Sequence, residues 1–221
     1  MIPYHFDWSV VSANLGLFGP AIVLTFQVSL VAEVLALAIG LIVALGRLQR
    51  ALIVRLVATA FIELFRSVPL LVLLIWIYYG LPILIGYSFD AFTAGVLGLA
   101  LLYGANLAEV FRSGLQAVPK GQREAASTLG LNRWQTSYLI VIPQAVRIVI
   151  PALANSFVGM LKDSTLVSVL GLTEFMRMSQ TVVAASFRPF EVYTFAAIVY
   201  LTLTLIFGRI VAVVERRSSI A

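Results

Sequence analysis

The sequence predicts an all-α polytopic membrane protein with about five transmembrane helices, and two observations carry this prediction. Of its 221 residues, 61% are hydrophobic and only 11% are charged, whereas soluble domains average about 45–50% apolar and about 25% charged residues. The chain also contains five long apolar stretches with few charged residues, and about 20 such residues in a helix cross a bilayer core. Because these stretches lack the strict alternation of membrane β-strands, we expect helices rather than a barrel.

We expect the spans to lie in a single transmembrane domain that covers residues 1–221. The first apolar stretch is too long for a signal peptide, and the residues before it include Asp7 but no Lys or Arg, the reverse of the charge that a signal peptide carries. It should therefore remain in the protein as the first helix. The expected helices cover, in order, about 20–46, 56–84, 91–111, 146–170 and 191–212.

The positive charges predict the orientation of these helices. If the helices alternate in direction, eleven of the 15 Lys and Arg residues fall on one side of the membrane, whereas only Arg177 and Arg188 fall on the other. Short cytoplasmic loops carry an excess of basic residues. We therefore expect the N-terminus outside, and the C-terminus and the connection between helices 3 and 4 in the cytoplasm. On the outer side, Thr173–Phe187 has the mixed polarity of a short surface helix.

Composition also excludes several kinds of function. The chain has no cysteine, and its single histidine, His5, precedes the first span, so we expect neither a metal site nor histidine-based catalysis. A net charge of +5 in so apolar a chain fits the positive-inside bias, and we expect no nucleic-acid binding. The phosphate-binding pattern G-x-x-x-x-G-K-[ST] is absent from the sequence, so any energy from ATP must reach this chain from another subunit.

The long cytoplasmic connection predicts a helix, a stop and a second helix over residues 119–143. Glu124 is expected in the first turn, where a negative charge interacts favourably with the helix dipole. Gly130 can supply a left-handed stop and Asn132 can cap the second helix. Pro143 marks where that second helix must bend or end. These parts alone are also typical of an ordinary interfacial helical hairpin.

The full spacing of this connection resembles a known signature. It reads Glu124-Ala125-Ala126, three residues, Gly130, nine residues and then Ile140-Val141-Ile142-Pro143. This pattern is similar to the cytoplasmic E-A-A signature of the permease subunits of binding-protein-dependent type I ABC importers, with Ile142 in place of the usual leucine. Further motifs that resemble the polar amino acid branch of that family are Glu63-x-x-Arg66-Ser67-Val68-Pro69, Ala108-Glu109-Val110-Phe111-Arg112, Gly121-Gln122, Pro143-Gln144-Ala145 and Leu161-Lys162-Asp163-Ser164-Thr165-Leu166.

The resemblance implies a permease subunit that forms the translocation pathway of an ATP-driven importer of polar or charged amino acids in the bacterial inner membrane. Two copies of an ABC ATP-binding subunit would bind ATP and Mg, and this chain itself would hold no cofactor. The other implied partners are a second permease subunit, identical or related, an extracytoplasmic solute-binding protein, the amino acid substrate and membrane lipid. The residues implied to couple to the ATP-binding subunit, through a coupling helix, are Glu124, Ala125, Ala126, Leu129, Gly130 and Leu131.

Polar and ionisable residues inside the expected spans are costly, and by default they mark pathways or partners. Glu63 and Arg66 are three residues apart and can form a structural ion pair, with Pro69 kinking the helix behind them. The sequence leaves the partner of Glu33 open. An amino acid is a zwitterion, so a site for it inside the bundle needs groups of both signs. The candidate pathway residues are Asn106, Glu109, Asn155, Lys162, Asp163, Ser164 and Thr165.

The role of Glu109 has a structural alternative, because Arg112 follows it at the spacing of an ion pair. Two other classes of function also compete with an ATP-driven importer. In an ion-coupled secondary transporter or channel, Glu33, Glu109 and Lys162 would relay ions, but five helices without inverted repeats make a poor independent carrier. An intramembrane enzyme would need a nucleophile with its base, and the sequence lacks a G-x-S-x-G turn. Strict dependence on ATP separates the importer from both.

Overall fold

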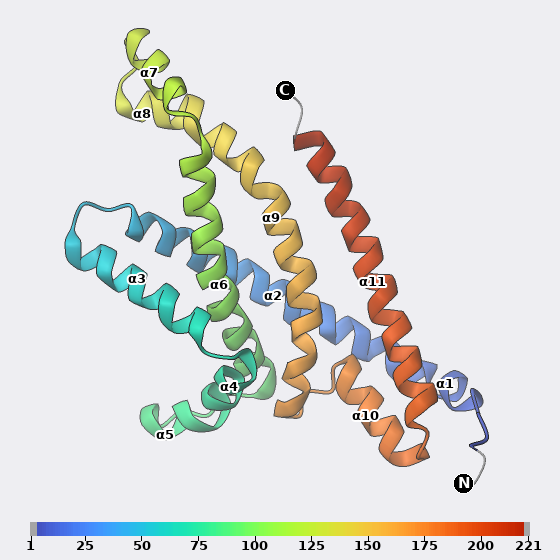
Figure 1. Ribbon diagram of the computed structural model, residues 1–221. Helices are drawn as coiled ribbons and strands as arrows, with labels where there is room; N and C mark the ends of the chain where they lie inside the picture. Colours follow the sequence, from blue (N-terminus) through green and yellow to red (C-terminus); the bar gives the residue numbers. More distant parts are fainter. Residues whose placement is uncertain (1–3, 219–221) are drawn as a thin grey trace. The chain divides into compact units, whose positions relative to one another are not determined.

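The computed structural model describes residues 4–218, and the regular elements in this part of the chain are all helices (Figure 1). In chain order they are α1 (Ser9–Ala13), α2 (Leu15–Arg47), α3 (Leu52–Ser67), α4 (Leu70–Ile75), η1 (Trp76–Gly80), α5 (Leu81–Ile85), α6 (Ala91–Ala117), α7 (Lys120–Thr128), α8 (Arg133–Thr136), η2 (Ser137–Val141), α9 (Ile142–Asp163), η3 (Ser164–Leu170), α10 (Phe175–Ser186) and α11 (Pro189–Ser218). Of these, η1 and η2 are π-helical and η3 is a 3-10 helix.

Four helical stretches within the described residues are long and apolar enough to cross a membrane without interruption. They are Leu15–Arg47, Ala91–Ala117, Arg133–Leu170 and Pro189–Val213, and they include the expected ranges 20–46, 91–111, 146–170 and 191–212. A fifth span results if α3 and the helical stretch after it are counted together. The all-helical, multi-span class predicted from the sequence is therefore confirmed.

The expected second span, 56–84, is interrupted rather than kinked. α3 ends at Ser67, Val68 has an extended backbone with φ −86° and ψ 128°, and α4 begins after Pro69. A proline ring clashes with a helical conformation of the residue before it, and proline has no N–H to continue the helical hydrogen bonds. The expectation of a kinked but continuous helix is therefore wrong at this point.

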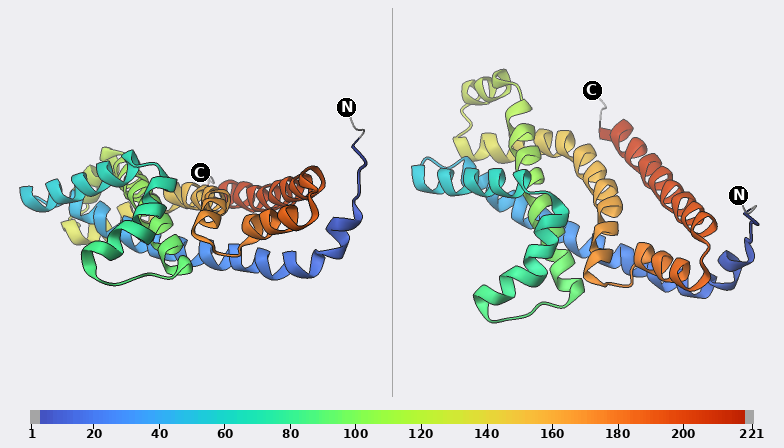
Figure 2. Two further views of the ribbon diagram at one scale, coloured as in Figure 1. Left: turned by 90° about the horizontal axis from the view of Figure 1, so that it is seen from below. Right: turned by 60° about the horizontal axis from the view of Figure 1, so that its bottom comes forward.

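The chain divides into two compact units, and the first comprises the chain up to Glu33, Pro69–Leu99 and Val158–Phe207. In its core, the first half of α2 packs against α10 and the first turns of α11, which lie side by side in both views of Figure 2. The buried apolar side chains of this core are Phe18, Ala21, Phe175, Val182, Val192 and Ala196. α10 is therefore not simply a surface helix, because one of its faces is buried against two spanning helices.

The second unit comprises Val34–Val68, Ala100–Phe157 and the chain from Gly208. Here α2 and α6 approach each other closely at two glycines. A Cβ atom on Gly40 would lie 2.8 Å from the Leu107 Cβ, and one on Gly104 would lie 2.8 Å from the Ile39 Cγ2. Both distances are too short for carbon atoms in contact, so only glycine fits, as is common where membrane helices pack backbone to backbone. This contact positions the polar end of α6 described below.

Candidate functional site: the α7–α8 hairpin and the charged residues of the spans

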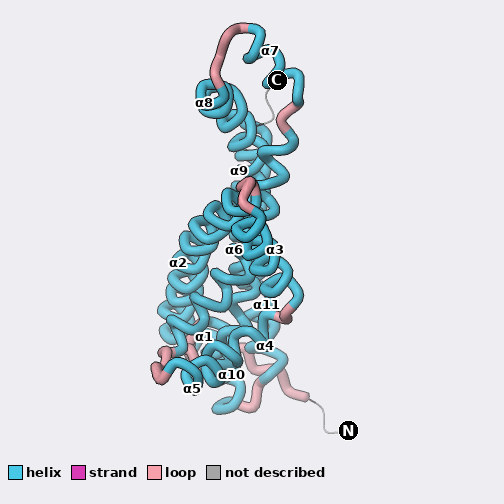
Figure 3. The backbone as a smooth tube through the Cα atoms, turned by 90° about the vertical axis from the view of Figure 1, so that its left-hand side faces the viewer, coloured by secondary structure: helices cyan, strands magenta, loops and turns pink. Residues whose placement is uncertain are grey.

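The segment after α6 folds into a hairpin of α7 and α8 joined by a short loop (Figure 3). At the loop, Gly130 has φ +76°, a left-handed conformation that glycine adopts without strain. The Gly130 N–H donates to the Ser127 carbonyl at 3.1 Å, and the Leu131 N–H donates to the Ala126 carbonyl at 3.0 Å. This pair of bonds is a Schellman motif. The left-handed stop predicted at Gly130 is confirmed.

The second helix of the hairpin begins with a reciprocal cap. The Gln135 N–H donates to the Asn132 Oδ1 at 2.9 Å, and the Asn132 N–H donates to the Gln135 Oε1 at 2.9 Å. This capping box satisfies two backbone groups that would otherwise lack a partner at the helix start. Asn132 therefore caps α8 as predicted, and the loop between Gly130 and Asn132 is fixed from both sides.

The second helix does not end at Pro143. A π-helical segment, Ser137–Val141, precedes the proline, and Pro143 lies in the first turn of α9. Proline lacks an N–H, and its ring needs space at the carbonyl four residues before it, which the wider π turn provides. The disturbance expected at Pro143 takes the form of this π segment, and the helix continues as α9 through the following span.

The hairpin exposes three large apolar or aromatic side chains among polar ones. Leu129 and Trp134 expose 78% and 86% of their surface, and Tyr138 exposes 74%. Glu124 is also exposed, but it is the fifth residue of α7, which begins at Lys120, so its expected place in the first turn is wrong. Exposed aromatic and apolar side chains among polar ones mark surfaces that bind other proteins.

The predicted coupling residues lie together on this hairpin. Glu124, Ala125, Leu129 and Gly130 are exposed, Leu131 is half-buried and Ala126 is fully buried. Trp134 and Tyr138 were not among the predicted site residues. Their spacing of four residues on a polar helix was the available signal, because it places two aromatic rings on one helix face.

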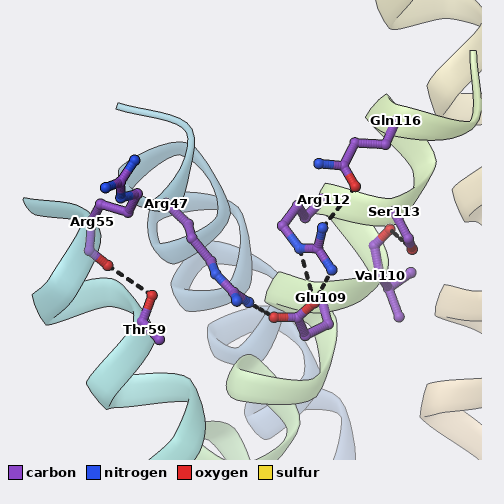
Figure 4. Close-up of polar contacts among 8 residues, drawn as sticks. All are labelled: Arg47, Arg55, Thr59, Glu109, Val110, Arg112, Ser113 and Gln116. Carbon is purple, nitrogen blue, oxygen red and sulfur yellow. Dashed lines mark hydrogen bonds and ion pairs between the residues drawn. The ribbon is translucent and has the colours of Figure 1, made fainter. Parts of the chain in front are cut away.

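Glu109 is held by arginines from two helices (Figure 4). Its Oε2 accepts hydrogen bonds from the Arg112 Nε at 2.9 Å and Nη2 at 2.6 Å, and its Oε1 forms an ion pair with Arg47 at the end of α2. Arg112 also donates to the Gln116 Oε1 at 2.7 Å. The ion pair that the three-residue spacing allows is thus present. Arg47, which the sequence did not connect to it, leaves the group with one excess positive charge.

Two other candidate pathway residues, Asn106 on α6 and Asn155 on α9, belong to the same unit as Glu109. Asn106 is half-buried one turn before Glu109, and Asn155 is exposed on α9. Asn106, Glu109 and Asn155 belong to the second unit, whereas the group from Lys162 to Thr165 belongs to the first. The structure therefore divides the candidate set between the two units.

The group at the end of α9 lies where the helix narrows into η3. Lys162 is exposed, Asp163 is half-buried and Ser164 is buried. The Ser164 and Thr165 hydroxyls donate to backbone carbonyls of the preceding turn, of Leu161 at 2.8 Å and of Lys162 at 2.7 Å. Both hydroxyl groups keep an oxygen lone pair available to another donor.

The expected ion pair between Glu63 and Arg66 is absent from the described residues, and the partner of Glu33, which the sequence left open, is not found there either. Glu63 and Arg66 are exposed, and within the described residues no ion pair joins them. Glu33 is only 6% exposed, and its Oε2 has no hydrogen-bond partner in the described part of the chain.

A buried polar network around Glu174 was not singled out by the sequence. Glu174 is 1% exposed, and its carboxylate accepts the N–H groups of Met176 at 3.0 Å and Arg177 at 2.7 Å, which caps α10. The Thr25 hydroxyl on α2 and the Tyr200 hydroxyl on α11 donate to the same carboxylate at 3.3 and 3.4 Å. Burial raises the pKa of Glu174 above its ordinary value. No local pattern links these distant residues, so sequence reasoning had no signal for them.

Several helices long enough to span a membrane, with an exposed helical hairpin between two of them, define a multi-pass membrane protein. The chain belongs to the family of binding-protein-dependent transport system inner membrane components, whose model matches residues 36–220. It is therefore a multi-pass permease, as the E-A-A spacing predicted.

Two relatives match almost the whole chain. The glutamine transport system permease protein GlnP of Escherichia coli strain K12 is 34% identical over 217 residues, 98% of this chain and 99% of that protein. The probable amino-acid permease protein YxeN of Bacillus subtilis strain 168 is 35% identical over 215 residues, 96% of each chain.

Among solved structures, the chain is similar to the crystal structure of an amino acid ABC transporter with histidines. The TM-score is 0.92 at 36% sequence identity, covering 97% of this chain and 100% of that chain. The fold is thus that of a type I ABC permease, in agreement with the predicted fold class.

Proposed function

We propose that this chain is the permease subunit of an ATP-driven importer of polar or charged amino acids. The exposed α7–α8 hairpin carries the proposal, because it combines the family's E-A-A spacing with exposed apolar side chains suited to a partner. The substrate class is supported by relatives named for glutamine and amino-acid transport and by similarity to an amino acid ABC transporter.

The hairpin would couple transport to ATP. It would dock on an ABC ATP-binding subunit, present in two copies that bind ATP and Mg, since this chain has no phosphate-binding loop. The Schellman motif at Gly130 and the capping box at Asn132 make the turn rigid, and α8 continues through η2 into α9. A displacement of the tip would therefore move a spanning helix. The proposed coupling residues are Glu124, Ala125, Ala126, Leu129, Gly130 and Leu131.

The proposal also includes the other members of the transporter and the residues of its pathway. A second permease subunit, identical or related, would complete the pathway, and an extracytoplasmic solute-binding protein would deliver the amino acid at the bacterial inner membrane. The proposed pathway residues are Asn106, Glu109, Asn155, Lys162, Asp163, Ser164 and Thr165, which offer the two signs of charge that a zwitterion needs.

Reconstitution tests the function directly. The chain is combined in proteoliposomes with candidate ATP-binding and solute-binding proteins, and amino acids are scanned for stimulated ATP hydrolysis and for uptake. We expect uptake that requires ATP and the binding protein and is specific to polar or charged amino acids. Uptake driven by an ion gradient without ATP would assign the chain to the secondary transporters instead.

The pathway residues are tested by Glu109→Gln and Lys162→Met in that system. We expect a change in the transported amino acids or in their apparent affinity, with ATP hydrolysis largely retained. Loss of assembled complex would indicate a structural role, and unchanged selectivity in well-assembled variants would remove these two residues from the pathway.

A further inference from the structure

A pocket lies behind the hairpin, within the second unit. Its volume is about 670 Å³, and it is bounded by the ends of α2 and α6 on one side and by α7, α8 and η2 on the other. Leu48 directly follows the span that ends at Arg47, and Leu115 lies in the last turn of the span that ends at Ala117. The pocket therefore lies at the ends of two candidate spans, where we expect the helices to leave the hydrocarbon core and meet lipid headgroups.

The charged side chains that line this pocket are all positive. Arg123 and Arg133 line it, together with the hydroxyl-bearing Ser137, and none of the lining residues is acidic. In the described part of the chain, neither arginine forms an ion pair with a carboxylate. The Arg123 Nη2 donates to the Leu115 carbonyl at 3.1 Å, which holds the guanidinium at the pocket, while its other N–H groups can bind a ligand.

The rest of the lining is apolar. Leu48, Val141 and Ile142 contribute hydrocarbon surface beside the arginines. A free inorganic anion would make no use of this surface, whereas a lipid brings a phosphate and an acyl chain to the same place. Guanidinium groups bind phosphate through paired hydrogen bonds, and basic residues at the cytoplasmic face attract anionic lipids.

We propose that this pocket binds the headgroup of an anionic phospholipid, with Arg123 and Arg133 on the phosphate and the apolar wall beside the first acyl carbons. The lipid lies between the coupling hairpin and the ends of two spans, so it supports the hairpin from the membrane side. The proposal does not depend on the transport function, because lipid binding is a property of the full chain alone.

The test measures lipid retained by the purified full chain in detergent, by native mass spectrometry during titration with phosphatidylglycerol or phosphatidylcholine. We expect selective retention of phosphatidylglycerol. Arg123→Gln combined with Arg133→Gln should weaken it about 30-fold, given the usual contribution of a basic residue near an anionic membrane surface. The double variant Arg123→Lys with Arg133→Lys keeps both positive charges and should lose much less phosphatidylglycerol binding than the glutamine variant.

The matched control combines Arg50→Gln with Arg55→Gln, which removes two exposed arginines from the α2–α3 region outside the pocket. It should change binding less than twofold. An equal loss of phosphatidylglycerol binding in the pocket variant and in the control variant would overturn the proposal, because it would indicate general charge attraction. Equal retention of phosphatidylglycerol and phosphatidylcholine by the unmodified chain would also overturn it. Displacement of the lipid by millimolar glycerol phosphate would assign the pocket to soluble anions. Because the comparison of the two lipids uses the unmodified chain, it tests the proposal even if a variant fails to fold.

Discussion

At the scale of single residues, the carboxylate of Glu109 controls the charge balance where α2 and α6 meet. Arg47 and Arg112 both approach it, and all three side chains are roughly three-quarters buried, with exposures between 22% and 29%. Removing the carboxylate would leave two guanidinium groups close together without compensation. Glu109 is therefore important for stability whether or not it also faces the substrate.

We expect Glu109→Gln to lower the free energy of unfolding by about 2 kcal/mol, since hydrogen bonds to charged groups contribute about 1.5–3 kcal/mol. Glu63→Gln is the matched control, because Glu63 also precedes an arginine by three residues but is exposed and lacks the ion pair. Its effect should stay within about 0.5 kcal/mol. Thermal unfolding of the two purified variants measures both, and equal effects would contradict the anchoring role of Glu109.

The burial of Glu174 predicts that the stability of the fold decreases as the pH rises, whereas a carboxylate held by hydrogen bonds stabilises the fold as the pH rises. Because burial raises the pKa of Glu174, the folded chain holds a proton that the unfolded chain releases. The stabilisation is complete below the ordinary glutamate pKa of about 4.3 and is lost as the pH rises toward the raised value. We expect the melting temperature to fall over this window, and Glu174→Gln to flatten the decrease. An unchanged slope in this variant, compared with Glu63→Gln, would refute the assignment.

Asp90 makes the stability of the fold depend on pH in the opposite direction, and it does so at lower pH. Hydrogen bonds from the Thr93 N–H at 2.9 Å and the Thr93 hydroxyl at 2.7 Å lower the pKa of its carboxyl. Its stabilisation is present above the ordinary aspartate pKa and disappears as the pH falls below it. The Glu174 measurement should therefore start no lower than about pH 4.

At the scale of elements, the hairpin was the most predictable part of the chain. Its stop at Gly130 and its cap at Asn132 depend on hydrogen bonds between residues no more than five apart, so the sequence contains all the necessary information. Pro69 was expected to disturb its helix for the same local reason. Whether a proline kinks a helix or breaks it depends on what packs around it, which the sequence alone does not specify.

We expect Gly130→Val to abolish productive association with the ATP-binding subunit while membrane insertion stays near normal. A β-branched residue resists the left-handed conformation of Gly130, at a cost of about 1–2 kcal/mol, and the two helices would be directed differently. Pull-down with the ATP-binding subunit and stimulated ATP hydrolysis are the measurements.

Gly86→Val is the control for backbone strain alone. Gly86 has φ +70°, and, as at Gly130, no atom lies within 4 Å of an added Cβ, but it lies outside the hairpin. The Gly86→Val variant should lose about as much stability as Gly130→Val and should still associate with the ATP-binding subunit. Gly130→Asn, which tolerates the left-handed conformation, should restore much of the function. Normal coupling in Gly130→Val would show that the hairpin turn is not the coupling element.

At the scale of the whole molecule, the order of the long apolar helices followed from the apolar stretches of the sequence, whereas the contacts between distant residues did not. Arg47 meets Glu109, and Thr25 and Tyr200 meet Glu174, only because helices far apart in sequence pack together. No short-range pattern encodes these pairings. The pathway residues remain a prediction, since their selection rests on charge and placement in the spans.

The membrane orientation is tested on a chain that has no native cysteine. Ser127→Cys on α7 and Thr181→Cys on α10 introduce exposed thiols, whereas Ser179 on α10 is buried and unsuitable. We expect an impermeant maleimide to label Thr181→Cys from outside right-side-out vesicles, and Ser127→Cys only after the vesicles are opened. Labelling of Ser127→Cys in sealed vesicles would reverse the proposed topology.

The exposed hairpin tip also has a consequence for how a cell maintains this protein. A newly made copy without its proposed partner would leave the Trp134 and Leu129 side chains exposed, and exposed hydrophobic surface makes a protein prone to aggregation and to removal by chaperones and proteases. If the tip docks on an ATP-binding subunit as proposed, an assembled copy would be shielded, whereas a surplus copy would be degraded. The tip would then act as a quality-control signal that keeps the subunits in matched numbers without matched synthesis.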